Sequence, residues 1–171
     1  MAKTQSVITL RPGSFSASTE TGNPSVEEFI SDVTVDQRAS VLDTIEESRE
    51  GVRLEDANVI VSGGRGLGGP EPFSVLHDLA NVLEGAVGAS RAACDAGWID
   101  HAYQVGLTGK SVTPDLYIAV GISGASQHMA GCSSSRAIVA INKDADSNIF
   151  KEPRYGVVGD WEKVLPAFYP L

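Results

Sequence analysis

Short, uninterrupted apolar segments alternate with helix-like segments over residues 58–171, and this alternation constrains the fold more than any other feature. Such runs lack the polar–apolar alternation of a strand with one wet face, so they predict strands buried on both faces. Six strands are expected, at Val59–Val61, Ala86–Ala89, Tyr103–Gly106, Leu116–Ile122, Ala137–Ile141 and Tyr155–Val158. Helices are expected between them, at 73–83, 91–96, 124–131 and 160–165. The pattern predicts an α/β fold with a doubly wound, mostly parallel sheet of about six strands.

The first 57 residues have a different sequence pattern. Short β-rich pieces predict strands at Ser6–Leu10, Val26–Val35 and Ala39–Ile45, with a Ser-, Thr- and Gly-rich loop over residues 14–25. Arg53–Ala57 is expected to form at most a short helical turn. We interpret residues 1–171 as one domain, with a β-rich flank over 1–57 and a parallel α/β core over 58–171.

Composition excludes several classes of protein. The chain has 171 residues with 22 acidic and 13 basic side chains, a net charge of −9, which argues against a nucleic-acid binder that neutralises phosphates. No apolar run approaches the ~20 residues that a membrane helix needs. Cys94 and Cys132 form no CxxC pair, so a metal site is not expected, and they indicate thiols in a reducing compartment. Residues 1–5 lack the features of a signal peptide, so we expect no export.

Small or polar residues follow every predicted strand of the core. Ligands bind at the carboxyl ends of strands in open α/β sheets, so these positions are the candidate site. The segments are 62–67, 88–91, 106–109, 121–128, 142–144 and 159–160, and two of them carry an arginine. This pattern suits a long ligand with phosphates, hydroxyls and a polar ring.

The first of these segments continues as Gly64-Arg65-Gly66-Leu67-Gly68-Gly69, which satisfies the G-x-G-x-x-G pattern. Three interpretations stay open. It is a dinucleotide fingerprint, a flexible glycine turn, or a phosphate-binding loop of another type with Arg65 as its cation. Pro70 and Pro72 delay the following helix, which argues against the first interpretation, and we favour the third.

His128 and Arg91 also have two interpretations each. His128 opens a predicted helix after the most apolar strand, and it faces either a ligand or solvent. Arg91 either contacts a ligand or pairs with Asp95, four residues along a helix. His77 and His101 have weaker contexts. No nucleophile elbow, HExxH motif or compelling catalytic triad is present, so no catalytic residue is assigned, and a bound cofactor is expected to supply any chemistry.

Several of these motifs together resemble a known family. The segments 62–67, 88–93, 114–125, 127–128, 140–144 and 155–160, in this order and spacing, resemble the electron transfer flavoprotein α-subunit. Thr9–Gly13 resembles the strand at which that family enters its C-terminal, FAD-binding domain. The resemblance implies a Rossmann-like, DHS-like domain with FAD lying across the strand ends. In this family the chain is an electron carrier and not a substrate-transforming enzyme.

The resemblance also implies a role for each part of the site. Arg65 and Ser90 would lie along the pyrophosphate and ribityl region, whereas Arg91, Thr108 and His128 would face the isoalloxazine ring. The expected FAD-binding residues are Arg65, Ser90, Arg91, Val105, Gly106, Leu107, Thr108, Ser123, Gly124, Ala125, Ser126, Gln127, His128, Asn142, Asp160 and Trp161, of which Asn142, Asp160 and Trp161 would serve the adenosine end.

Two departures from the family pattern stand out. Leu107 occupies a position where the family usually has glutamine, and the family's N-terminal domain, which packs against the β-subunit, has no counterpart in a chain of about half the family length. The implied partners of the full family protein are the β-subunit, flavoprotein dehydrogenases such as those of fatty acid β-oxidation, and a downstream quinone oxidoreductase. The implied location is the bacterial cytoplasm or the mitochondrial matrix. The alternative is an NAD- or nucleotide-binding enzyme or regulatory module on a related parallel sheet.

Overall fold

The computed structural model describes residues 8–9, 15, 19, 21–23, 25–28, 30, 40–43, 52–151 and 155–168. The chain divides into two units, residues 1–49 and 50–171, and every helix and strand among the described residues belongs to the second. Of the strands predicted at 6–10, 26–35 and 39–45, residues 8–9, 26–28, 30 and 40–43 are described, and none of these lies in a strand, so the predictions are wrong there. Their other residues lie outside the described part of the chain. The boundary near residue 58 stays a prediction. The short turn predicted at Arg53–Ala57 is present, closed by a 3.1 Å bond from the Asp56 amide to the Arg53 carbonyl.

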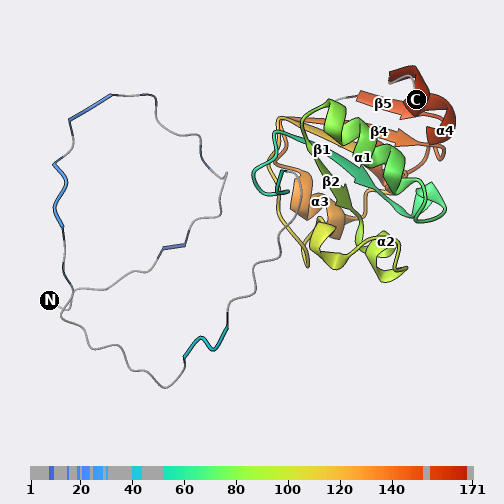
Figure 1. Ribbon diagram of the computed structural model, residues 1–171. Helices are drawn as coiled ribbons and strands as arrows, with labels where there is room; N and C mark the ends of the chain where they lie inside the picture. The colour runs from blue at the N-terminus through green and yellow to red at the C-terminus, as the bar shows by residue number, and fades with distance from the viewer. Residues whose placement is uncertain are drawn as a thin grey trace, which may run out of the picture. The chain divides into compact units, whose positions relative to one another are not determined.

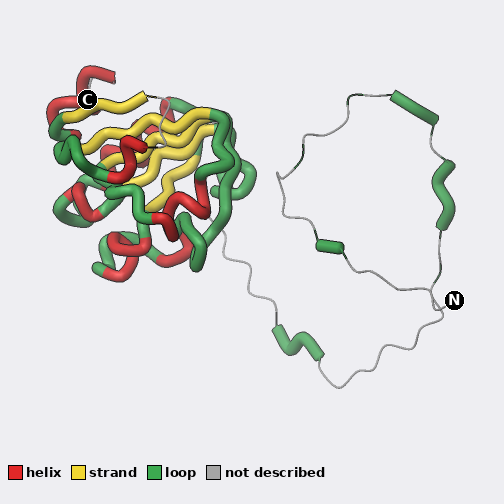
Figure 2. Tube along the Cα trace, turned by 180° about the vertical axis from the view of Figure 1, so that it is seen from behind, coloured by secondary structure: helices red, strands yellow, loops and turns green. Residues whose placement is uncertain are grey.

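Five parallel strands form one sheet. Figures 1 and 2 show this sheet from opposite sides. In chain order they are β1 (Val59–Gly63), β2 (Ala86–Ala89), β3 (Leu116–Val120), β4 (Ala137–Asn142) and β5 (Tyr155–Val158), and their order in the sheet is β2-β1-β3-β4-β5. The α/β class and the parallel, doubly wound sheet are therefore confirmed. After β1 the chain adds β2 on one side of it, and then adds β3 on its other side. The direction in which strands are added to the sheet therefore reverses between β1 and β3.

Helices cover both faces of the sheet because alternate strand residues point to opposite sides. The described α-helices are α1 (Phe73–Val82), α2 (Arg91–Asp95), α3 (Ser126–Cys132) and α4 (Trp161–Phe168). Buried residues of α1, α2 and α4 join one core cluster with Val61, Val120 and Ile141 of the sheet. Those of α3 join the other cluster, with Ile60, Tyr117 and Ile138. Each predicted helix is present within a few residues of its expected ends.

The strand predicted at Tyr103–Gly106 is wrong, which leaves five strands in place of about six. Tyr103 ends a 3-10 helix that starts at His101, and Gln104 and Val105 make only single bridges, to Ala89 and Lys110. The physical reason is a local turn. The Gly106 amide bonds the Lys110 carbonyl at 3.0 Å and the Lys110 amide bonds the Gln104 carbonyl at 2.7 Å, so these groups are used before a ladder can extend.

No helix in the described part of the chain is long and apolar enough to cross a membrane.

Candidate functional site

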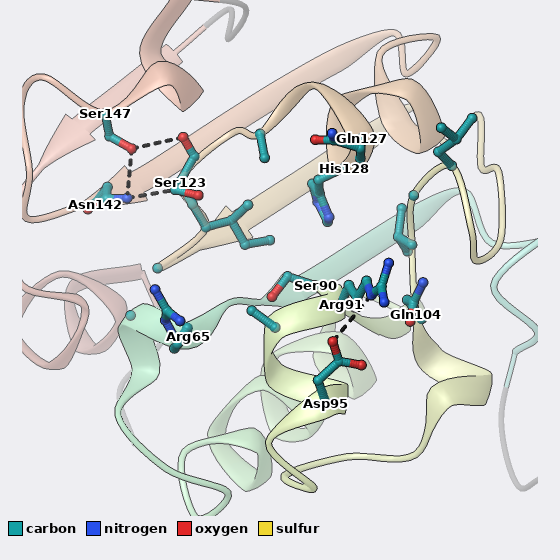
Figure 3. A pocket seen from close by; sticks show the side chains of 18 of the residues that line it. Arg65, Ser90, Arg91, Asp95, Gln104, Ser123, Gln127, His128, Asn142 and Ser147 are labelled. Atoms are coloured by element: carbon teal, nitrogen blue, oxygen red, sulfur yellow. Dashed lines mark hydrogen bonds and ion pairs between the residues drawn. The ribbon is translucent and has the colours of Figure 1, made fainter.

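A cavity of about 600 Å³ opens at the carboxyl edge of the sheet, where the order of strands reverses between β1 and β3 (Figure 3). Crevices of this kind are the usual ligand sites of open α/β sheets, because loops on the two sides diverge there. The lining comes from segments that follow β1, β2, β3 and β4, together with the turn at 104–108. Its volume lies within the usual range for small-molecule and cofactor sites.

Glycines allow the backbone after β1 to lie against the backbone after β3. The Gly64 amide bonds the Val120 carbonyl at 2.8 Å, and the Gly66 amide bonds the Gly121 carbonyl at 2.9 Å. A Cβ at Gly121 would lie 2.8 Å from the carbonyl carbon of Gly66, and the φ of Gly121 is +64°. These two hydrogen bonds therefore fix the turn after β1 against the backbone after β3. Arg65 extends from this turn and lines the cavity.

The helix after this turn begins only at Phe73, after a separate 3-10 turn at Arg65–Leu67. A dinucleotide fingerprint requires the helix to open directly from the glycine motif. The structure therefore argues against that interpretation of residues 64–69.

Twelve of the sixteen predicted residues line the cavity: Arg65, Ser90, Arg91, Val105, Gly106, Leu107, Thr108, Ser123, Ala125, Gln127, His128 and Asn142. Asp160 and Trp161 line a separate small recess of about 20 Å³, which shares Gly66, Gly121 and Asn142 with the cavity. Gly124 and Ser126 line neither. Gly124 instead has a packing role, because a Cβ there would lie 2.3 Å from the Ile149 amide nitrogen.

Eight lining residues were not in the predicted set: Gly66, Ala92, Asp95, Gln104, Gly121, Ile122, Asp144 and Ser147. Gly66, Gly121, Ile122 and Asp144 lie inside the strand-end segments already identified as the candidate site, and Ala92 and Gln104 directly adjoin the predicted Arg91 and Val105. Asp95 was considered as the partner of Arg91. Nothing in the sequence marks Ser147, because tertiary contacts bring it to the cavity.

Two arginines lie at the cavity, and their surroundings differ. Arg91 donates from Nε to Asp95 Oδ2 at 3.2 Å, so the pairing considered from sequence is present, and Arg91 lines the cavity as well. Both partners are exposed, which makes this pair worth little to stability. Arg65 forms no ion pair with any residue that the structure describes. Its charge is therefore available to an anion in the cavity.

Ser90 precedes α2 and caps it. Its Oγ accepts a bond from the Ala93 amide at 3.4 Å, so the hydroxyl oxygen is engaged while its proton remains a donor. The side chain also lines the cavity. Ser90 can thus position the helix and donate a hydrogen bond to a ligand.

Asn142 ties the loops after β3 and β4 together. Its Nδ2 donates to the Ile122 carbonyl at 3.0 Å and to Ser147 Oγ at 3.3 Å, and Ser147 in turn donates to the Ser123 carbonyl at 3.0 Å (Figure 3). These bonds fix the segment that leads into α3. In that segment, the backbone amides of Ser126 and Gln127 have no backbone acceptor among the described residues. They remain available to an acceptor in the cavity.

His128 is 7% exposed and lies over the buried Tyr117, whose hydroxyl is 3.0 Å from His128 Nε2. Burial lowers the pKa of His128 to about 4, and the backbone of Val105 only partly opposes this shift. His128 is therefore neutral at physiological pH. In this state it offers a hydrogen-bond donor and an acceptor but no charge, so Arg65 and Arg91 are the cations of the cavity lining.

This depressed pKa predicts a pH dependence of stability. An unfolded His128 takes up its proton near pH 6.5, whereas the folded residue does so only near pH 4. The unfolded state therefore binds more protons in this window, and the free energy of unfolding should fall as the pH falls from about 6.5 to 4. His128→Gln should remove up to about 3 kcal/mol of this fall.

Urea unfolding of the wild type and the variant between pH 7 and pH 4 measures the effect. His77→Gln is the matched control, because His77 is exposed on α1 and outside the cavity. Unfolding free energies of wild type and His128→Gln that stay parallel across this range would contradict the prediction.

Comparisons with known proteins agree with the geometry. A family described as the electron transfer flavoprotein FAD-binding domain matches residues 53–133. The electron transfer flavoprotein subunit alpha of Thermoanaerobacterium thermosaccharolyticum is 51% identical over 168 residues, which cover 96% of this chain and 51% of that protein. The proteins of the same name from Bacillus subtilis and Paracoccus denitrificans are 50% and 48% identical over 92% and 94% of this chain, and 49% and 52% of their own lengths. The chain thus spans about half the length of these relatives.

Proposed function

Because this chain belongs to the electron transfer flavoprotein α-subunit family, whose FAD-binding domain it carries, we propose that it binds FAD and serves as an electron carrier. The observation that carries the proposal is the cavity of about 600 Å³ at the reversal point of the sheet. Its lining combines an arginine without an ion-pair partner among the described residues, the helix-capping hydroxyl of Ser90, and backbone amides that have no backbone acceptor in the described part of the chain. A pyrophosphate and a polar ring require donors of this kind.

The proposed arrangement assigns one part of FAD to each part of the cavity. Arg65 and Ser90 bind along the pyrophosphate and ribityl region, because Arg65 has no competing carboxylate among the described residues and Ser90 keeps a free hydroxyl proton. Arg91, Thr108 and His128 face the isoalloxazine ring. The adenosine end lies toward Asn142 and the small recess that Asp160 and Trp161 line.

The chemistry available in this chain favours a carrier over a substrate-transforming enzyme. Bound FAD supplies the electron chemistry of the site, and the protein supplies binding and orientation. Neither cysteine suits a nucleophile, because burial raises the pKa of Cys94 to about 11 and that of Cys132 to about 12. His128 is held neutral by burial, and no His/Cys/Asp/Glu cluster among the described residues could hold a metal ion.

Partners follow from the same proposal. The β-subunit, flavoprotein dehydrogenases and a downstream acceptor are proposed for the full-length protein, and a cytoplasmic location stays a prediction. A native-mass measurement with a β-subunit tests the first of these, and a stoichiometric complex formed by this chain alone would locate β-subunit contacts within residues 1–171.

Cofactor identification tests the proposal directly. The purified protein should carry, or take up on titration, a flavin that denaturation releases and chromatography identifies as FAD. Flavin absorbance should appear at one FAD per chain, and NAD should not compete for the site. A protein that stays colourless after incubation with FAD but binds NAD would overturn the proposal in favour of a nucleotide-binding enzyme or regulatory module.

A further inference from the structure

A chain of five side chains joins two walls of the cavity. Thr108 and Arg91 stand at its ends and line the cavity, and Gln104, His101 and Asp95 connect them. The successive contacts are Gln104 Nε2 to Thr108 Oγ1 at 2.9 Å, His101 Nδ1 to Gln104 Oε1 at 3.2 Å, His101 Nε2 to Asp95 Oδ1 at 3.9 Å and Arg91 Nε to Asp95 Oδ2 at 3.2 Å. His101 itself does not line the cavity.

The direction of each hydrogen bond follows from the chemistry of its groups. The amide oxygen of Gln104 can only accept, so Nδ1 of His101 carries a proton and donates to it. The amide nitrogen of Gln104 can only donate, so the oxygen of Thr108 accepts. No other described residue accepts from the Thr108 hydroxyl, and its proton is therefore free to point into the cavity.

The opposite orientation of the Gln104 amide would reverse this result. The amide oxygen would then face Thr108 and take its proton, and Thr108 would offer only lone pairs to a ligand. Gln104 is 5% exposed, so water has little access to replace either bond. The reversed amide would place its nitrogen, a donor, against a protonated Nδ1, so it requires the other tautomer of His101, with Nδ1 unprotonated. A proton on Nδ1 of His101 therefore goes together with the orientation of Gln104 that the structure has. Asp95 lies near Nε2 of His101 and is the carboxylate that faces the imidazole ring.

We propose that Gln104, oriented by His101, is a positioning residue that holds Thr108 as a hydrogen-bond donor to the ring of the bound flavin. This inference rests on the proposed function. A donor at an electron-rich ring stabilises the reduced flavin relative to the oxidised one. His101 thus acts on the ring from outside the cavity, through two hydrogen bonds in series.

The test is a double-mutant cycle of flavin potentials with Gln104→Leu and Thr108→Val. Each single substitution should lower the affinity for reduced relative to oxidised flavin by about tenfold, which lowers the two-electron potential by about 30 mV. The double variant should show the shift of one substitution only, because both remove the same donor. Additive shifts, or a rise in potential, would overturn the proposal.

His101 provides the more selective arm of the experiment. His101→Ala should shift the potential in the same direction, whereas His101→Asn, which keeps an N–H donor, should restore it. His77→Ala is the matched control, because it removes another exposed histidine that does not line the cavity. Equal potentials in wild type and His101→Ala would remove His101 from the proposal.

A measurement without flavin separates this inference from the proposed function. In the flavin-free protein, the side-chain amide protons of Gln104 should exchange slowly with solvent, and His101→Ala should accelerate that exchange at least tenfold by NMR. Unchanged exchange would contradict the orienting role of His101. A wild-type protein that binds no FAD would instead refute the proposed function, whatever the exchange rates.

Discussion

Arg65→Ala is expected to weaken FAD binding by one to two orders of magnitude. Arg65 lines the cavity on the turn after β1, and no ion pair with a described residue competes for its charge. A charge-assisted hydrogen bond contributes roughly 1.5–3 kcal/mol, which corresponds to about a 10- to 150-fold change in the dissociation constant. Because the guanidinium can bind phosphate through two N–H groups, Arg65→Lys should recover only part of the loss.

Titration of the flavin-free protein with FAD measures this effect. Arg136→Ala is the control, because Arg136 is an exposed arginine that pairs with Asp115 and does not line the cavity. Riboflavin, which lacks the phosphates, should bind Arg65→Ala and the wild type with similar affinity. An unchanged dissociation constant for FAD in Arg65→Ala would refute the assignment of Arg65 to the pyrophosphate.

Gly121→Ala is expected to destabilise the protein by at least about 3 kcal/mol and to impair FAD binding with it. The φ of +64° alone costs an alanine roughly 1–2 kcal/mol. The new Cβ would also lie 2.8–3.0 Å from three backbone atoms of Gly66 and Leu67. Backbone atoms cannot rotate away as a side chain does, so the turn after β1 must move and carry Arg65 with it.

Gly97→Ala isolates the contribution of backbone conformation. Gly97 has a φ of +73°, but a Cβ there meets no atom within 4 Å, and the residue does not line the cavity. It should lose only the 1–2 kcal/mol of conformational strain and keep its FAD affinity. Denaturant unfolding and FAD titration of both variants give the comparison. Equal destabilisation in the two variants would show that the contact with Gly66 and Leu67 contributes nothing.

The local sequence pattern was sufficient to predict a strand where both faces of that strand are buried. The segments that became β1, β3 and β4 are continuously apolar, because both faces of a parallel strand are covered, and each was expected within two residues of its observed bounds. The segment at Tyr103–Gly106 is shorter than the observed β1, β3 and β4 and contains one polar residue, Gln104. There, hydrogen bonds between Gln104, Gly106 and Lys110 close a local turn, and no window of sequence distinguishes that outcome from a short strand.

The candidate site shows the same division. Strand ends are visible in the sequence, so Arg65, Ser90 and His128 could be predicted to converge, since the carboxyl ends of parallel strands meet at one edge. Thr108 also lines the cavity, although the strand predicted before it is absent. The state of each group could not be predicted. Whether His128 carries a charge depends on its burial against Tyr117, which is eleven residues away in the chain.

The sequence by itself determined the α/β class, the parallel sheet and the edge at which the cavity opens, because apolar runs and strand-end glycines report on local backbone and burial. Only the tertiary structure decided which polar groups remain free. In the structure Arg65 has no carboxylate partner among the described residues, and Asn142 joins two loops by hydrogen bonds. Gln104 connects His101 to Thr108. Hydrogen-bond direction and desolvation depend on neighbours in space, and sequence spacing does not encode them.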